Sequence, residues 1–373
     1  MRRRTSISLI SILKPVNDTR MFEKFGLSLG QTNKYEINII GFKSKKIKKV
    51  ENVHFYPIFD FPRLSLGRFL APYRLFQYLV KVKPTIVIFS TPEIQHIIFL
   101  YKLFFGCKVI YDIQENYYRN IRYGRNYIKI FRYFFSNLVR MVEIAGSGYL
   151  DAVIYAEQGY RKELPNCLGK KATVIRNTYN NIFEEKVIKK NRKEDITLLF
   201  SGTIAESYGI FSAIQFIDLF HKKYSAVKLL IAGHCANKSV FKEVLLQIKN
   251  KPYIQLIGGS ELVPHEDIIR LIQSVDFGLV CYNINPSIEN CFPTKIYEYM
   301  ANKLPMIVQD YYPWSSFCLK YNAAIEVNFE NIDYDKLYAQ LLKESFYTQD
   351  LPDEIFWQKD EKKLLGLIDD FLS

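Results

Sequence analysis

The sequence has few cysteines and no hydrophobic run long enough to cross a membrane. Its six cysteines form no C-x-x-C pair and no dense spacing, which argues against a disulfide scaffold or a structural zinc site and favours reduced thiols in the cytoplasm. The longest apolar stretch, IQHIIFLYKLFF, is interrupted by Lys102 and is shorter than the ~20 residues that span a bilayer. No internal repeat or low-complexity segment is present. We therefore expect a globular protein without a membrane-spanning helix.

The first residues resemble a secretory signal only superficially. The basic residues 1–4 precede the short apolar run SISLISIL, but KPVNDTR follows it where a small-residue cleavage site would be required. We expect this run to be the first buried strand.

Charge is distributed unevenly along the 373 residues, of which 49% are hydrophobic and sufficient for two cores. Residues 1–182 carry 30 Lys and Arg against 12 Asp and Glu, a net of +18, whereas residues 183–373 carry 21 against 26, a net of −5. This asymmetry indicates an anionic partner for the first half: a membrane surface, a phosphorylated lipid or nucleic acid. The alternative is a basic surface that only water contacts.

Short β-rich runs alternate with longer helical patterns, which is typical of parallel sheets flanked by helices. Predicted strands lie near 6–13, 36–42, 85–90, 109–113, 152–155 and 173–176, and in the second half near 197–201, 228–232, 254–257, 277–282, 305–308 and 324–327. Residues 63–83 fit either a surface helix or a loop. The charged segment KVIKKNRKED at 186–195 is a predicted linker.

Two doubly wound domains follow, with ligands at the carboxyl ends of the strands, facing a cleft between the domains. The predicted boundaries are 1–185 for the first domain, 196–350 for the second and 351–373 for a C-terminal helix.

The stretch NCFPTKIYEYMA at 290–301 predicts a helix that begins at Pro293 or Thr294. Helical spacing puts Thr294, Lys295 and Glu298 on one arc, opposite a packing face. The first turn of a helix together with Lys295 suits a phosphate, and Glu298 suits the vicinal diol of a ribose. An ordinary amphipathic helix with solvated charges is the alternative.

The run PTKIYEYMANKLPMIV resembles the nucleotide-sugar-binding helix and following strand of family-4 GT-B glycosyltransferases. The resemblance implies a GT-B fold of two Rossmann-like domains, the first binding the acceptor and the second a nucleotide-sugar. Glu298 matches the second Glu of the family motif, which holds the ribose. Asn290 stands where the first Glu is expected, as in a subgroup that reads N-x-x-P-S/T-K, and implies an amide contact to the donor sugar.

Other segments of the second half resemble the same family. In LLFSGTIAESYGI, Gly202 and Thr203 permit a close approach of backbone amides to phosphate. The family's basic residue is missing near Ser207, which leaves Lys295 as the side-chain cation. The turn that contains His265 resembles the loop around the base, with helix capping as the alternative. The donor-binding residues that the resemblance implies are Gly202, Thr203, Ser207, His265, Tyr282, Asn290, Pro293, Thr294, Lys295 and Glu298.

In the first half, LKPVNDTRMFEKFG resembles the family's loop with a D-x-R sequence. This implies that Arg20 contacts a phosphate of the acceptor or donor and that Asp18 orients it, both as catalytic residues, while a plain helix cap is the alternative for Asp18. The strand that ends VIYDIQE has Gln114 in place of the family's histidine. Glu115 is expected to contact the acceptor or donor sugar as a catalytic residue, Gln114 is expected to help bind the acceptor, and a structural role is the alternative for Asp112.

Residues 116–142 contain no acid, and their Arg and Lys residues alternate with Tyr and Phe. This composition fits a lipid headgroup layer, stacking on nucleic-acid bases, or a core helix with a basic outer face. No RNA-binding motif accompanies it, so an anionic membrane is the expected partner and nucleic acid is not.

The resemblance implies a retaining glycosyltransferase that needs no metal and no cofactor, in which we expect Lys295 and the helix N-terminus to stabilise the departing phosphate. No D-x-D motif lies between the predicted strand ends. The expected acceptor is a lipid-linked or other saccharide in cell-surface polysaccharide synthesis, and the expected location is the cytoplasmic face of the membrane. A nucleotide-sugar 2-epimerase and an inactive binding subunit are the alternatives.

Overall fold

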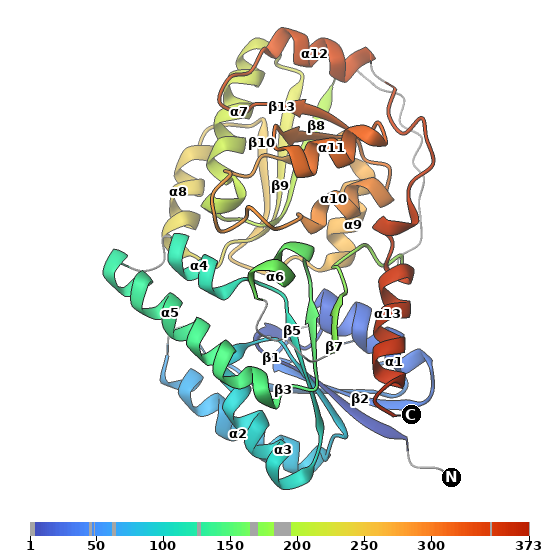
Figure 1. Cartoon of the computed structure of the whole chain (residues 1–373). Coiled ribbons are helices and arrows are strands. Elements are labelled where there is room, and N and C mark those ends of the chain that lie inside the picture. The colour runs from blue at the N-terminus through green and yellow to red at the C-terminus, as the bar shows by residue number, and fades with distance from the viewer. Residues whose placement is uncertain are drawn as a thin grey trace. The chain divides into compact units, whose positions relative to one another are not determined.

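The computed structural model describes residues 4–44, 47, 49–61, 65–124, 128–164, 171–182, 195–343 and 345–372. The chain divides into two compact units, Met1–Asn180 with Trp357–Ser373, and Asn181–Phe356. Each unit is a parallel sheet with helices on both faces (Figure 1), so the predicted doubly wound α/β class is confirmed. The boundaries between the two units lie within a few residues of the predicted domain boundaries. The predicted linker lies outside the described residues, except for Asp195.

The first unit contains a sheet of seven parallel strands in the order β3-β2-β1-β4-β5-β6-β7. The strands are β1 (Thr5–Pro15), β2 (Tyr35–Phe42), β3 (Val53–Phe59), β4 (Ile86–Phe89), β5 (Lys108–Ile113), β6 (Ala152–Tyr155) and β7 (Lys171–Val174). The sequence analysis missed β3, which contains Pro57. Proline is tolerated there because β3 is the edge strand and pairs only with β2.

The helices of the first unit lie on both faces of its sheet (Figure 1). They are η1 (Thr19–Gly26, a short π-helical segment), α1 (Leu27–Gln31), α2 (Leu66–Val82), η2 (Pro92–Ile94), α3 (Gln95–Phe105), α4 (Tyr117–Tyr123), α5 (Lys129–Gly146), η3 (Ser147–Tyr149), α6 (Gln158–Glu163) and α13 (Trp357–Asp369). The uncertain stretch 63–83 is a helix from Leu66 onward. Because the crossovers from β3 through β6 step in one direction, their right-handedness places α2, α3 and α5 on the same face.

The C-terminal helix α13 packs in the core of the first unit, on the face that η1 and α1 cover. The indole of Trp357 stacks on Phe25 with ring centroids 5.9 Å apart and donates to the Ser28 hydroxyl at 2.8 Å. One turn later the fully buried carboxylate of Asp360 accepts from Lys363 at 2.6 Å. The first unit is therefore completed by residues from the far end of the chain.

The second unit contains a sheet in the order β10-β9-β8-β11-β12-β13. Its strands are β8 (Ile196–Thr203), β9 (Val227–His234), β10 (Ile254–Gly259), β11 (Phe277–Val280), β12 (Met306–Gln309) and β13 (Ala324–Val327). Its helices are η4 (Glu206–Tyr208), α7 (Ile210–Lys223), α8 (Lys238–Ile248), α9 (His265–Ser274), α10 (Thr294–Ala301), α11 (Tyr312–Lys320), α12 (Tyr334–Lys343) and η5 (Asp353–Ile355). All strands predicted for this half are present.

The inward side of α5 carries a buried carboxyl group. Glu143 is 4% exposed and accepts a hydrogen bond from the Tyr111 hydroxyl of β5 at 3.1 Å. Burial raises the pKa of Glu143 from its ordinary 4.5 to about 7, although Arg140 and Tyr111 act in the opposite direction. The folded protein therefore holds this proton to a higher pH than the unfolded chain does.

We predict that Glu143→Gln stabilises the protein more at pH 8 than at pH 5. The raised pKa of Glu143 has no effect on stability below the pKa of the unfolded chain and its full effect above the pKa of the folded protein. As the pH rises between these two values, the wild type loses up to ~3 kcal/mol of unfolding free energy, whereas Gln does not titrate. Thermal unfolding at both pH values measures the difference. Glu243→Gln, at an exposed position on α8, controls for the change of residue. A gain from Glu143→Gln that is the same at both pH values would contradict the prediction.

Candidate functional site

The carboxyl ends of β8 and β11 form the centre of the candidate site. The strand order reverses between them, and open α/β sheets bind ligands at such a point. Gly209, just before α7, has a φ of 79°, and a Cβ there would lie 1.8 Å from the carbonyl oxygen of Cys281. Only glycine therefore lets the turn after β8 lie against the end of β11. Gly202 and Thr203 are exposed at the start of this turn, where the sequence predicts contact with phosphate.

Helix α10 begins at Thr294, within the predicted range, and no side chain caps it. A buried tyrosine fixes its position. The Tyr299 hydroxyl lies 2.8 Å from the Ser201 hydroxyl and donates to the Leu199 carbonyl at 3.2 Å. Its ring occupies the space where Gly278 has no side chain, since a Cβ there would lie 2.4 Å from the ring. Gly278 thus allows the first turn of α10 to sit beside the strand ends.

Lys295 is far more buried than the sequence predicts. Its side chain is 5% exposed, and Nζ lies 4.4 Å from the ring centroid of Phe200 and 4.9 Å from that of Tyr282. Among the described residues, no atom forms a hydrogen bond with Nζ. Burial lowers the pKa of Lys295 to about 8, while Cys281 and Glu298 act in the opposite direction. The ammonium group is therefore held between aromatic rings, and in the described part of the chain no anion forms a hydrogen bond with it.

Glu298 and His265 come together at the side of α10. His265 Nε2 lies 3.2 Å from Glu298 Oε1, and both side chains are partly exposed. The capping alternative for His265 is wrong, because the cap of α9 is Pro264 and no side chain caps that helix. His265 thus orients the carboxylate that the sequence predicts to hold a ribose.

The other predicted donor contacts surround this group. Tyr282 stacks on Tyr208, with ring centroids 4.9 Å apart, and is nearly buried. The backbone next to Asn290 is fixed by α11: the Trp314 indole donates to the Cys291 carbonyl at 2.8 Å. Among the remaining predicted contacts, Ser207 and Asn290 are exposed, Thr294 is partly exposed and Pro293 is buried. The sequence analysis missed Tyr208, Gly278 and Tyr299, of which Tyr299 follows Glu298 directly in the motif that it used.

In the first unit, the predicted phosphate contact of Arg20 needs correction. Its guanidinium is 2% exposed and binds both oxygens of the Asp112 carboxylate, at 2.8 and 2.6 Å. It also donates to the Ile175 carbonyl at 3.0 Å. A buried bidentate pair of this kind fixes the loop after β1 to β5, so Arg20 is structural in this arrangement and Asp112 shares that role.

Asp18 takes the alternative role that the sequence allowed. Its carboxylate accepts from the backbone N–H groups of Arg20 and Met21 at 3.0 and 3.1 Å and so caps η1. Gln114 accepts from Lys14 and donates to Asp112 at 2.7 Å. Glu115 accepts from Asn120 of α4 at 3.0 Å and is partly exposed. Of the four predicted residues of this unit, Gln114 and Glu115 are the better placed to meet a ligand.

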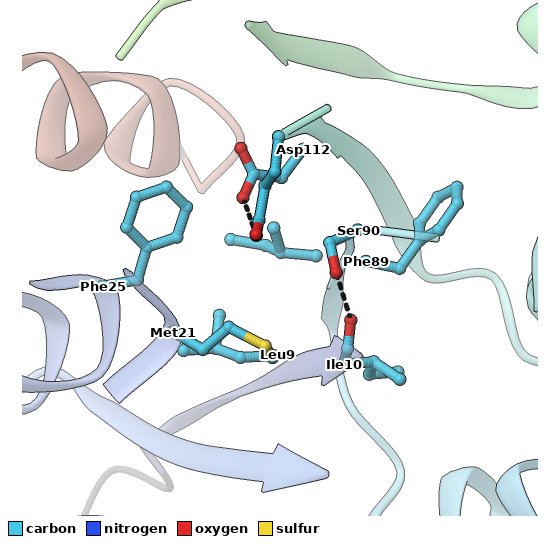
Figure 2. Close-up of a pocket in the computed structure, with 9 residues that line it drawn as sticks. Leu9, Ile10, Met21, Phe25, Phe89, Ser90 and Asp112 are labelled. Carbon is cyan, nitrogen blue, oxygen red and sulfur yellow. Dashed lines mark hydrogen bonds between the residues drawn. The ribbon is translucent and has the colours of Figure 1, made fainter. Parts of the chain in front are cut away.

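A pocket lies at the reversal of the first sheet, between β1 and β4 (Figure 2). Ser90 and Ile10 lie side by side in its lining, where the Ser90 hydroxyl donates to the Ile10 carbonyl at 3.5 Å (Figure 2). Asp112 and Gln114 supply its polar wall. Its free volume is about 10 Å³, which is roughly the space that one water molecule needs. It is therefore too small to enclose a sugar.

The described residues contain no group of three or more His, Cys, Asp or Glu side chains that is able to hold a metal ion. The five described cysteines are free thiols.

Residues 181–347, nearly the whole second unit, match the family model "Glycosyl transferases group 1". The second unit is a group 1 glycosyltransferase domain. No curated protein sequence matches the chain.

Solved structures resemble this glycosyltransferase over its full length. A sucrose-phosphate synthase from Thermosynechococcus elongatus has a TM-score of 0.65 at 12% identity, covering 98% of this chain and 95% of that one. A glycosyltransferase from Rickettsia africae ESF-5 has a TM-score of 0.60 at 15% identity, covering 100% of both chains. A UDP-GlcNAc 2-epimerase from Methanocaldococcus jannaschii has a TM-score of 0.55 at 13% identity, covering 98% and 99%. These likenesses show the GT-B fold, as predicted. Together with the family match they confirm the predicted resemblance to GT-B glycosyltransferases and the enzyme class.

We predict that Lys295→Met stabilises the glycosyltransferase in the absence of ligand. Because the pKa of Lys295 is lowered in the folded state, the protein is fully destabilised by it below pH 8. This destabilisation decreases as the pH rises toward the pKa of lysine in the unfolded chain. The gain is expected to be ~3 kcal/mol at pH 7 and smaller at pH 9.5, as measured by denaturant unfolding. Lys242→Met, at an exposed position on α8, is the matched control. Loss of stability in Lys295→Met at pH 7 would show that the amine has an undetected partner.

Proposed function

We propose that the chain transfers a sugar from a nucleotide-sugar to a lipid-linked or other saccharide acceptor in cell-surface polysaccharide synthesis, with retention of configuration and without a metal ion. The observation that carries the proposal is the unpaired ammonium group of Lys295 beside the uncapped start of α10. The group 1 glycosyltransferase match supplies the reaction class.

The donor site is built for a nucleoside diphosphate. An uncapped helix start offers unpaired N–H groups and a partial positive charge, and Lys295 adds a full charge. Glu298, which His265 orients, lies one turn further along α10 and suits a ribose diol. Tyr208 and Tyr282 form a stacked pair at the same strand ends, and aromatic faces of this kind suit a base or a sugar.

The same charges support catalysis by leaving-group stabilisation. As the bond between the sugar and the diphosphate breaks, negative charge grows on the phosphate, and Lys295 stabilises that charge most in the transition state. Its aromatic surroundings strengthen the effect, because few other dipoles compete there. We propose that the acceptor hydroxyl attacks from the face of the leaving group and passes its proton to the departing phosphate, which requires no nucleophile from the protein.

The acceptor is proposed to contact the first unit at Gln114 and Glu115. The pocket beneath them is too small to hold a sugar, so contact at the rim fits better than enclosure. Asn290, exposed on its loop, is proposed to contact the donor sugar through its amide.

We further propose that the protein works at the cytoplasmic face of a membrane, bound at its periphery through the basic first unit. Residues 1–182 carry a net charge of +18, and each basic residue near an anionic surface contributes ~1 kcal/mol. Within the described ranges no helix is long and apolar enough to span a bilayer. Arg125, part of the basic segment, lies outside these ranges.

A nucleotide-sugar 2-epimerase is the second candidate, because one of the similar structures is a UDP-GlcNAc 2-epimerase. Such an enzyme must move a proton at the sugar carbon and needs acid and base groups around it. The one His–carboxylate pair of the candidate site, His265 and Glu298, lies one turn from Lys295 on the side assigned to the ribose. This placement favours the transferase.

We predict that one of UDP-, GDP- and dTDP-sugars raises the melting temperature and is consumed only with a saccharide acceptor. A ligand at 100 times its Kd stabilises by roughly 2.7 kcal/mol, which a thermal shift resolves. NMR of the product then separates the candidates. A product with the same anomeric configuration as the donor sugar indicates retaining transfer. Conversion of the nucleotide-sugar to its 2-epimer without an acceptor would establish the second candidate instead.

We predict that Glu298→Ala weakens binding of that nucleotide. Each hydrogen bond from the ribose to a charged carboxylate is worth roughly 1.5–3 kcal/mol. Glu289→Ala, at an exposed position in the loop that precedes α10, is the matched control and is expected to bind normally. Isothermal titration with the nucleoside diphosphate measures both. Equal affinity in the two variants would remove Glu298 from the site.

A further inference from the structure

Helix α5 has an inverted distribution of polar and apolar residues. The residues of α5 that are buried against the rest of the unit are Ser136, Glu143 and Gly146. Its large apolar residues point outward instead, with Ile130 75% exposed and Met141 66% exposed. A surface helix of a soluble protein normally shows the opposite arrangement. The outer face of α5 is therefore suited to an apolar environment.

The neighbouring helices of the same layer continue this surface. Helices α2, α3 and α5 lie together on one side of the first sheet (Figure 1). Near the end of α3, Leu103 and Phe104 are 79% and 68% exposed, and on α2 Phe69 is 81% exposed. We call Phe69, Leu103, Phe104, Ile130, Phe134 and Met141 the apolar face. Exposed patches of contiguous large apolar residues mark interaction sites in proteins that are otherwise soluble.

Basic residues predominate around the apolar face, although several pair with acids of neighbouring segments: Arg68 with Glu93, Lys102 with Asp151 and Arg119 with Glu163. Helices α2 to α5 contain nine Lys and Arg residues, and their only acidic residue is the buried Glu143. The guanidinium of Arg122 lies 4.4 Å from the ring centroid of Tyr133, and that of Arg140 lies 4.9 Å from that of Tyr118, so basic groups of both α4 and α5 border the aromatic side chains. Apolar side chains bordered by cations complement one surface in particular, an acyl-chain layer beneath anionic headgroups.

We propose that the apolar face inserts into an anionic lipid bilayer, with α5 lying in the plane of the membrane and the first turn of α2 and the last turn of α3 beside it. The inference rests on the proposed peripheral location and specifies how the protein is held there. Binding then has two parts: the basic residues attract the headgroups, and the apolar face enters the hydrocarbon boundary. Salt screens only the first part, so binding weakens in high salt without disappearing.

The test uses the full chain and vesicles of phosphatidylcholine with 30% phosphatidylglycerol, sedimented at low and high salt. The wild type is expected to sediment in both. The double variant Leu103→Ser with Phe104→Ser is expected to bind only at low salt, and at high salt to lose roughly tenfold in partitioning for each side chain removed. Leu246→Ser, at a 65% exposed position on α8 of the second unit, is the matched control and is expected to bind like the wild type.

The depth to which the apolar face enters the bilayer is tested separately by fluorescence quenching. Tryptophan in Phe104→Trp is expected to be quenched by lipids brominated on their acyl chains, whereas tryptophan in Tyr312→Trp, at an 81% exposed position of the second unit, is not. Absence of quenching, or binding that high salt abolishes, overturns the insertion. The proposal is also overturned if the protein binds none of the vesicles and forms a dimer that Phe134→Ser dissociates. That result would identify the apolar face as a protein interface. Sugar transfer to a soluble acceptor, measured without vesicles, tests the proposed function independently.

Discussion

The buried amine of Lys295 is the constraint on which the candidate site depends. A cation held among Phe200, Tyr282 and the strand ends, with no hydrogen-bonding partner in the described part of the chain, has lost its water and gained no anion. The protein bears this cost in the free state, and the phosphate that we propose to bind beside the start of α10 would remove it. The cost in stability and the proposed role in catalysis thus have one origin. A lysine exposed to water at the same helix end would stabilise a leaving phosphate much less, because water would screen it.

The fold supplies this arrangement through close backbone contacts rather than through charged neighbours. Gly209 lets the turn after β8 touch the end of β11, and Gly278 makes room for the ring of Tyr299, which in turn anchors α10. In the first unit the corresponding position is filled from within, since Arg20 and Asp112 satisfy each other. The two sheets share a topology, yet among the described residues it is the second sheet that places a cation with no hydrogen-bonding partner at its reversal point. This difference fits a division of labour in which the second unit binds the charged donor.

The sequence predicted the helices and strands better than the surroundings of individual side chains. Strands and the start of α10 follow from periodicity and from Pro293, whereas β3 was missed because Pro57 argues against a strand unless its edge position is known. The burial of Arg20 and the contact of His265 with Glu298 could not be predicted, because their partners, Asp112 and Glu298, lie 92 and 33 positions away in the chain. The aromatic and basic composition of residues 116–142 was visible, but its outward orientation was not, since the same pattern describes a core helix. Burial of Lys295 depends on Phe200 and Tyr282, which no local pattern connects to it.

The pKa of Lys295 tests the central claim most directly. NMR titration of the protein labelled with ¹³C at the lysine ε-carbons, with Lys295→Met to assign the signal, measures it in the free and nucleotide-bound states. The account predicts a value of about 8 in the free protein. It also predicts a rise toward the ordinary lysine value when the nucleoside diphosphate of the accepted donor saturates the site, because a nearby phosphate favours the charged form. An ordinary value in the free protein, or a value that the bound diphosphate leaves at about 8, would contradict the account.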